Sequence, residues 1–246
     1  GAEGYREVVL TGIEISSWGA EWKDGPTLID LVGAVCRALP EGTRVRLGSL
    51  EPRTITEEFC RRASVLPNLC PHFHLSMQSG CDSVLRRMNR KYDTARYYES
   101  VQLLREYFDR PGITTDLIVG FPGETEEEFA QTLAFVEKCA FSAMHIFPYS
   151  RRSGTPAAAM PDQVPNAVKE ERAHRAGELA RRLEAAYLEQ WVGKSLPVLF
   201  EEERDGLWRG HAPNYVEVLA PGEGLHNVEK EVKITDWSEN YLIGVV

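Results

Sequence analysis

The sequence contains no run of about 20 consecutive apolar residues, the length that a helix needs to cross a bilayer, and it has no charged and then apolar leader. We therefore expect a cytoplasmic protein without membrane contact. Cysteine is also scarce: the five cysteines are odd in number and show no Cys-x-x-Cys spacing, which argues against a disulfide framework and favours a reducing compartment. We interpret these residues, Cys36, Cys60, Cys70, Cys81 and Cys139, as structural or incidental.

Positive charge is in short supply. The 246 residues include 28 Lys and Arg against 37 Asp and Glu, and the net charge of −9 argues against nucleic-acid binding by bulk electrostatics alone. One segment is an exception, because basic residues and tyrosines alternate there as in many RNA-binding surfaces. Its basic members are Arg86, Arg87, Arg90, Lys91 and Arg96. A solvated helical face has the same composition and remains an alternative interpretation.

Short β-branched runs alternate with amphipathic helical patterns over the first 150 residues. The pattern predicts strands at 7–13, 44–47, 73–77, 113–119 and 144–147, and helices at 26–39, 56–66, 94–108 and 125–139. Such alternation implies parallel strands with ligand-binding loops at their carboxyl ends. Five strands are too few for a closed eight-stranded barrel. We expect either an open sheet or a domain that is only partly present.

A different pattern follows the α/β part. A charged helical stretch at 166–190 precedes five short predicted strands, at 196–200, 207–211, 215–219, 228–235 and 241–246. We expect a small antiparallel barrel of the OB-like kind, which often serves as a nucleic-acid platform. The predicted organisation is an α/β domain at 1–164, a helical connector at 165–190 and a β domain at 191–246.

A glycine-bearing turn, Gly120 to Thr125, closes one predicted strand and opens a helix, where open α/β sheets bind ligands. Thr125 and the acidic residues 126–128 form a capping box and an acidic first turn, which would repel a phosphate. This is therefore not a phosphate loop. We expect Glu124 either to accept hydrogen bonds from a ligand's amine or hydroxyl, or to be a surface carboxylate of a tight turn.

Two histidines, His72 and His74, share one face of a predicted strand, and this spacing permits joint metal ligation. Asp116 and His145 on neighbouring strands could complete such a site. A metal-dependent barrel hydrolase is thus an alternative function. Against it, barrel enzymes place their ligands at the carboxyl ends of strands, whereas these histidines begin theirs. Packed or hydrogen-bonded histidines are the more common arrangement.

Five ordered segments are similar to the tRNA methylthiotransferases of the radical S-adenosylmethionine (SAM) superfamily, and the resemblance spans essentially the whole chain. The branch that acts on threonylcarbamoyladenosine shares two of the spellings, Arg-Met-Asn-Arg-Lys-Tyr at 87–92 and His-Ile-Phe-Pro-Tyr-Ser at 145–150. The other segments are Arg-Leu-Gly-Ser-Leu-Glu-Pro at 46–52, His-Phe-His-Leu-Ser-Met-Gln-Ser-Gly at 72–80 and Thr-Asp-Leu-Ile-Val-Gly-Phe-Pro-Gly-Glu-Thr at 115–125.

The resemblance implies an α/β fold, a partial radical SAM (TIM-like) barrel with a C-terminal OB-like TRAM domain. It implies methylthio addition to C2 of N6-threonylcarbamoyladenosine in the anticodon stem-loop of tRNA. S-adenosylmethionine would lie across the strand ends, with Gly12 and Glu14 at its amine, Arg46 and Ser49 at its carboxylate, Gln78 and Ser79 at the ribose, and Gly120, Phe147 and Tyr149 around the adenine. The basic segment and Arg152 would approach RNA, although Ser153 replaces a proline that is common after this arginine in the wider family.

The family also binds two 4Fe-4S clusters. One is held by Cys-x-x-x-Cys-x-x-Cys after the first barrel strand, the other by three cysteines of an N-terminal methylthiotransferase domain, and neither set occurs here. We therefore expect an N-terminally truncated protein that lacks the first barrel strand and generates no radical by itself. The sequence identifies no catalytic residue and no metal ligand. A methylthiotransferase for isopentenyladenosine tRNA or for a ribosomal protein, and a non-catalytic RNA-binding remnant, remain alternatives.

Overall fold

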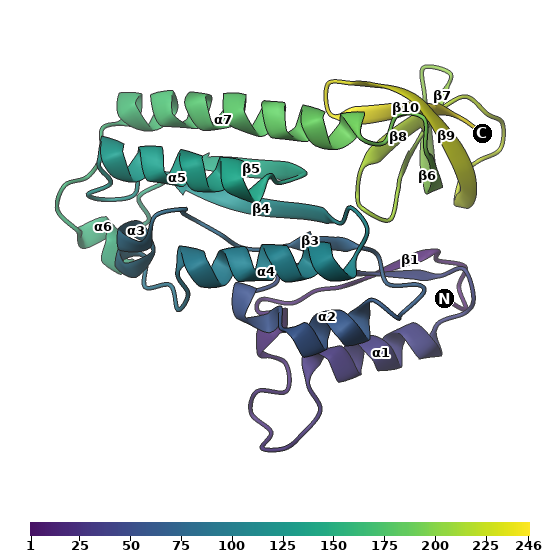
Figure 1. Ribbon diagram of the computed structural model, residues 1–246, viewed down its shortest axis with the longest axis horizontal. Helices are drawn as coiled ribbons and strands as arrows, with labels where there is room; N and C mark the ends of the chain where they lie inside the picture. The colour runs from purple at the N-terminus through teal and green to yellow at the C-terminus, as the bar shows by residue number, and fades with distance from the viewer.

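The computed structural model describes all 246 residues, and its first part is a sheet of five parallel strands flanked by helices (Figure 1). Strand β1 pairs with β2, strands β3, β4 and β5 pair in that order, and isolated parallel bridges join the two groups. The sheet stays open, which confirms the predicted partial barrel. The strands are β1 Glu7–Leu10, β2 Arg44–Leu47, β3 His72–His74, β4 Gly112–Val119 and β5 Ala143–Pro148.

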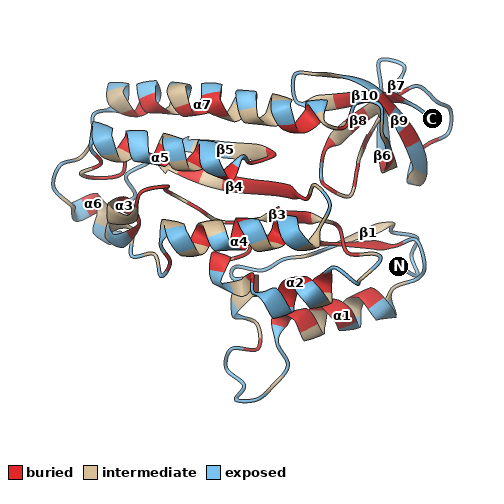
Figure 2. Cartoon of the chain, in the orientation of Figure 1, coloured by how far each residue is buried: buried red, intermediate tan, exposed pale blue.

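The helices begin where the sequence supplies a cap. Thr125 and Glu128 form the predicted capping box at the start of α5, and the side chain of Asp93 caps α4. Figure 2 shows buried and exposed residues alternating along both helices, as expected for helices that cover one face of a sheet. The helices are α1 Leu28–Ala38, α2 Glu57–Ala63, α3 Asp82–Arg87, α4 Thr94–Tyr107, α5 Glu126–Cys139, α6 Pro156–Ala159 and α7 Asn166–Glu189, with 3-10 turns at Ile15–Ser17 and Pro52–Thr54.

The two faces of the parallel sheet differ in polarity. Side chains of one face, such as Leu47, Phe73 and Leu117, are at most 1% exposed and belong to the main core beneath the helices. The opposite, inner face bears Thr114 and Asp116 between these apolar positions. A parallel sheet buried on both faces would be apolar throughout. The polar inner face is therefore the part of the fold that is available for chemistry.

Helix α7 does more than connect two domains. It runs beside α5 and against β5, and its residues Ala176 and Leu179 belong to the main core (Figure 1). Two charged residues of α7, Lys169 and Arg172, are also buried. No helix of the chain combines the length and the apolar content that a membrane span requires.

The C-terminal part is a closed barrel of five strands in the order β10-β8-β7-β6-β9. All its pairings are antiparallel except that of β8 with β10. It has a core of its own, which includes Val198, Phe200 and Leu242. The strands are β6 Ser195–Arg204, β7 Leu207–His211, β8 Glu217–Ala220, β9 Val228–Ser238 and β10 Tyr241–Val245.

The C-terminal barrel packs against the amino ends of the parallel strands. Arg44 donates to the carbonyl of His211 at 2.7 Å and Arg46 donates to that of Pro213 at 2.8 Å. Both guanidinium groups also bind Glu7 of β1, with Nε to carboxylate distances of 2.6 and 2.7 Å. This end of the sheet is thus covered by the β7–β8 loop, which leaves the carboxyl ends of the strands as the open end.

Candidate functional site

The inner face of the partial barrel places polar side chains in rows. The pairing of β4 with β5 sets Asp116 beside His145, and Ile118 beside Phe147 in the next row towards the carboxyl end. His145 and Phe147 are exposed, and Phe147 keeps 51% of its accessible surface. An exposed aromatic ring on a concave polar face is typical of a ligand-binding surface.

Hydrogen bonds link the inner-face residues of β3 and β4. The Thr114 hydroxyl lies 3.1 Å from Nε2 of His72 and 3.0 Å from Nδ1 of His74, and Nε2 of His74 lies 3.5 Å from an Asp116 oxygen. Burial lowers the pKa of His72 well below its usual value. Burial also lowers the pKa of His74, although the charge of Asp116 opposes this effect. Both rings are therefore neutral at neutral pH.

This arrangement does not favour the metal-dependent hydrolase. His72 and His74 do share a face, as predicted, but both direct a ring nitrogen at Thr114. No group of three or more His, Cys, Asp or Glu side chains in the chain is placed to hold a metal ion. The two histidines are hydrogen-bonded residues of the sheet.

We expect zinc to leave the thermal stability of the purified chain unchanged. A folded-state metal site occupied at a hundred times its Kd would add about 2.7 kcal/mol of stability, which for a chain of this size raises Tm by about 5 to 11 °C. Differential scanning fluorimetry with Zn²⁺ or with EDTA provides the measurement. A Tm increase of that size with Zn²⁺, lost in the double variant His72→Phe with His74→Phe, would restore the hydrolase hypothesis.

Four of the residues expected to bind the cofactor lie at the open end of the sheet. Gly12 and Glu14 follow β1 and Ser49 follows β2, and all three are exposed. Gln78 follows β3, is half-buried, and has a left-handed backbone with φ of 67°. No intramolecular hydrogen bond occupies the side chains of Glu14, Ser49 or Gln78. With Phe147 of β5, they form what we term the mouth, namely Gly12, Glu14, Ser49, Gln78 and Phe147.

The other four residues expected to bind the cofactor are occupied by contacts within the protein. Arg46 binds Glu7 and the β7–β8 loop at the amino end of the strands. Ser79 is buried and its hydroxyl lies 3.4 Å from that of Thr132 on α5. Gly120 is covered by Lys169, whose side chain leaves no room for a Cβ at this position. Tyr149 packs edge-on against Phe121, with its hydroxyl buried.

Both expectations for Glu124 are wrong. Its side chain is 4% exposed and accepts hydrogen bonds from the backbone N–H groups of Gly120 and Phe121, at 2.6 and 3.1 Å. Arg172 of α7 lies 3.5 Å from its other oxygen. Burial raises the pKa of Glu124 in spite of these partners. The carboxylate therefore holds the turn after β4 together and faces neither a ligand nor solvent.

The basic segment offers a smaller surface than its sequence suggests. Arg87 pairs with Glu128 on α5 and donates to the carbonyl of Gly123, and Arg96 donates to the carbonyl of Ile55. The interleaved Tyr92 and Tyr97 are buried, because each packs in the core and donates its hydroxyl to a backbone carbonyl. The basic residues left without an acidic partner are Arg86, Arg90, Lys91 and, beyond this segment, Arg152.

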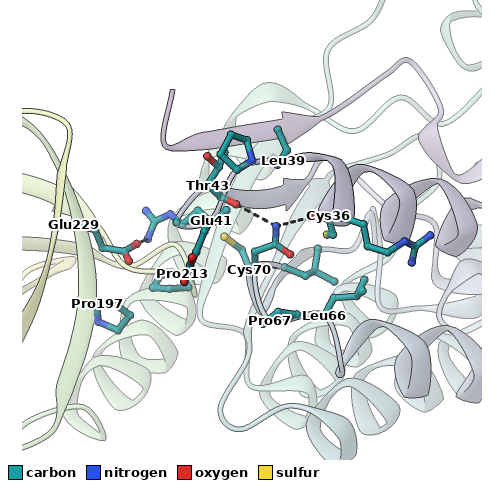
Figure 3. A pocket seen from close by; sticks show the side chains of 16 residues that line it. Cys36, Leu39, Glu41, Thr43, Leu66, Pro67, Cys70, Pro197, Pro213 and Glu229 are labelled. Atoms are coloured by element: carbon teal, nitrogen blue, oxygen red, sulfur yellow. Dashed lines mark hydrogen bonds and ion pairs between the residues drawn. The ribbon is translucent and has the colours of Figure 1, made fainter. Parts of the chain in front are cut away.

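The five thiols do not fit an iron–sulfur cluster. All are free and buried. Burial raises the pKa of Cys60 and of Cys139 to about 12, which disfavours the thiolate that iron requires. Cys36 and Cys70 line a separate cavity of about 600 Å³ between α1, β2 and the C-terminal barrel, shown in Figure 3.

Two features of the site were missed in the sequence. Helix α3 carries Arg86 and Arg87 but has only six residues, which are too few for a helical periodicity to be recognised in the sequence. The loop residue Tyr215 of the C-terminal barrel stacks on His72 with ring centroids 4.6 Å apart, and it lines a cavity of about 920 Å³ with His74 and His145. The alternation of Thr114 and Asp116 along β4 was an available signal for the polar inner face.

Comparison with known proteins gives a consistent result. The model of the radical SAM superfamily matches residues 1–136. The threonylcarbamoyladenosine tRNA methylthiotransferase MtaB of Bacillus subtilis is 38% identical over 224 residues, which are 89% of this chain and 49% of that protein. The tRNA-2-methylthio-N(6)-dimethylallyladenosine synthase of Thermobifida fusca is 41% identical over 82% of this chain and 40% of that protein. The chain spans about half the length of the curated relatives it matches.

Among solved structures, the radical S-adenosylmethionine methyltransferase TsrM of Kitasatospora setae superposes with a TM-score of 0.51. The superposition covers 64% of this chain and 30% of that chain at 18% sequence identity. At this identity the likeness concerns the fold alone. It supports the assignment of the parallel sheet as part of a barrel.

Proposed function

Because the chain belongs to the radical SAM superfamily, we propose that it is the barrel portion of a tRNA methylthiotransferase acting on N6-threonylcarbamoyladenosine beside the anticodon. The observation that carries this proposal is the mouth, a set of polar side chains without internal partners at the carboxyl ends of parallel strands. This is where α/β sheets bind their ligands. The expected location is the cytoplasm, where tRNA is modified.

The mouth residues fit S-adenosylmethionine. The Glu14 carboxylate would accept from the amine, the Ser49 hydroxyl would donate to the carboxylate, and Gln78 offers both a donor and an acceptor to the ribose. The exposed ring of Phe147 supplies a face for adenine. Beside a reduced iron–sulfur cluster, which this chain does not ligate, the bound cofactor supplies a one-electron oxidant strong enough for an unactivated C–H bond. This chain contributes binding and orientation.

Basic side chains near the mouth support an approach of RNA from that end. Helix α3 bears Arg86, and the segment that precedes α6 bears Arg152. Both helices lie at the end of the molecule opposite to the C-terminal barrel (Figure 1). With Arg90 and Lys91, these residues would contact phosphates of the stem. The C-terminal barrel carries more acidic than basic residues, so we assign it a smaller share of phosphate binding.

A second candidate function is methylthio transfer to isopentenyladenosine in tRNA. Relatives named for that reaction match this chain as well as those named for the threonylcarbamoyl reaction, at 41% and 38–40% identity. A likeness to both groups does not separate the two substrates. The polar side chains Asp116 and His145 on the inner face favour the threonylcarbamoyl substituent.

The test is nucleoside mass spectrometry of tRNA from a strain without the gene, with and without the intact gene on a plasmid. We expect the methylthio derivative of threonylcarbamoyladenosine to disappear, its precursor to accumulate by the same amount, and the plasmid to restore both. Loss of the methylthio group from isopentenyladenosine would establish the second candidate. Unchanged levels of both derivatives would refute the methylthiotransferase assignment.

A further inference from the structure

One pair of inner-face residues is suited to bind a polar group. Asp116 on β4 and His145 on β5 are register partners, so their side chains leave the sheet on the same face. The Asp116 side chain is 32% exposed and His145 is exposed. A carboxylate acceptor and an imidazole thus lie side by side on the concave surface, one row below the ring of Phe147.

Asp116, His74, Thr114 and His72 are linked by polar contacts, and at each contact the donor and the acceptor can be assigned. The Asp116 carboxylate only accepts, so Nε2 of His74 donates to it, and Nδ1 of this neutral ring accepts from the Thr114 hydroxyl. The oxygen of Thr114 then accepts from Nε2 of His72. His72 is 5% exposed and stacks on Tyr215, so it cannot turn away. The chain from His72 through Thr114 and His74 therefore holds Asp116 as an acceptor.

We propose that Asp116 and His145 determine substrate specificity by binding a polar N6 substituent of the target adenosine, one that carries both N–H or O–H donors and oxygen acceptors. The inference rests on the proposed function. A carbamoyl or hydroxyl-bearing substituent donates an N–H or O–H group to Asp116, and its carbonyl oxygen accepts from His145. An aliphatic substituent offers neither and displaces water from a carboxylate that it cannot pair.

A large cavity with several polar residues in its lining begins at His145 of this pair. The cavity of about 920 Å³ extends from His145 and His74 towards the C-terminal barrel. Arg209 and His211 of β7 and Tyr215 of the following loop also line it. A substituent bound at His145 therefore borders a compartment whose lining includes ionisable and hydrogen-bonding side chains.

Binding of anticodon stem-loop RNAs tests the inference with this chain itself. We expect RNA that carries threonylcarbamoyladenosine to bind about tenfold more tightly than RNA that carries isopentenyladenosine, measured by fluorescence anisotropy. Asp116→Asn and His145→Phe should each bring the ratio of the two RNA affinities close to one. Glu137→Gln, which removes one exposed carboxylate from α5, should leave it unchanged.

Each outcome separates the inference from the proposed function. Equal affinity for both RNAs in the unaltered chain, or a tenfold ratio that survives Asp116→Asn, overturns the specificity role and leaves RNA binding intact. Failure to bind any stem-loop overturns both. Tighter binding of the isopentenyl RNA overturns the inference and supports the second candidate function.

Thr114 provides a test of the positioning chain that does not depend on RNA. We expect ¹⁵N NMR of the histidine rings to show the Nε2–H tautomer for both His72 and His74. Thr114→Val should give a mixture of His74 tautomers and should lower the ratio of the affinities for the two stem-loop RNAs. Thr114→Ser should restore the single tautomer and the affinity ratio. A His74 tautomer unchanged by Thr114→Val would contradict the direction of the chain.

Discussion

Replacing Glu7 with alanine is expected to lower the free energy of unfolding by about 3–5 kcal/mol, because it leaves two buried guanidinium groups without their main counter-charge. The side chains of Arg44 and Arg46 are 7% and 4% exposed, and both bind the Glu7 carboxylate. They would keep backbone carbonyls of the β7–β8 loop as partners. Carbonyl dipoles compensate a buried charge only in part.

Urea denaturation followed by circular dichroism gives this free energy. Glu3→Ala removes an exposed carboxylate four residues earlier and should change the stability by less than about 0.5 kcal/mol. A Glu7→Ala variant as stable as Glu3→Ala would show that the ion pairs only balance their own desolvation.

The same carboxylate predicts a pH dependence. Burial alone would raise the pKa of Glu7, but the hydrogen bonds and charges of Arg46 and Arg44 outweigh it and lower the pKa below its usual 4.5. A lowered pKa in the folded state gives stability that is complete above pH 4.5 and is lost as the pH falls through the lowered value. Denaturation profiles of the unaltered chain and of Glu7→Ala should therefore converge in acid.

Replacing Glu124 with alanine is expected to cost a similar amount, about 3–5 kcal/mol. The buried N–H groups of Gly120 and Phe121 would lose their acceptor. Arg172 would lose its nearest carboxylate, in a place where the side chains of Arg172 and Glu124 are only 5% and 4% exposed. Arg172 would keep Glu126 at 3.6 Å and the backbone carbonyl of residue 124 at 3.0 Å.

Glu124→Gln separates the acceptor from the charge. The amide oxygen can still receive both N–H groups, so we expect this variant to lose only about 1 kcal/mol. Because burial raises the pKa of Glu124, the charge itself is disfavoured in the fold, and its removal should cost little. Equal losses for alanine and glutamine in urea denaturation would mean that the ion pair with Arg172, and not the N–H groups, stabilises the turn.

Local patterns were sufficient to predict most elements of the fold. Strand β2 and strand β7 have the predicted bounds, and the capping box at Thr125 starts α5 as expected. These features depend on residues within a few positions of one another. The first strand ends at Leu10 instead of residue 13, because only Glu7–Leu10 has a pairing partner in β2.

The errors in the site arise from contacts between distant segments. Arg46 and Glu124 are charged residues in segments typical of ligand binding. Each is held by a partner far away in sequence, Arg46 by Pro213 and Glu124 by Arg172. Neither partner shares a local motif with them. Period-2 alternation shows that Arg46 faces inward, but only the position of the C-terminal barrel shows what it meets there.

The position of that barrel has a consequence for protein engineering. The contacts that fasten it join side chains of β1 to β3 to carbonyl groups of the β7–β8 loop, to the ring of Tyr215 in that loop and to Glu229 of β9. A hybrid that takes its last 56 residues from a homologue should thus dock if the donor keeps the backbone path at 211–214, an aromatic ring at 215 and a carboxylate at 229. Swaps that alter Glu7, Arg44 or Arg46 should weaken this docking, since only the contacts of Tyr215 and of α7 would remain.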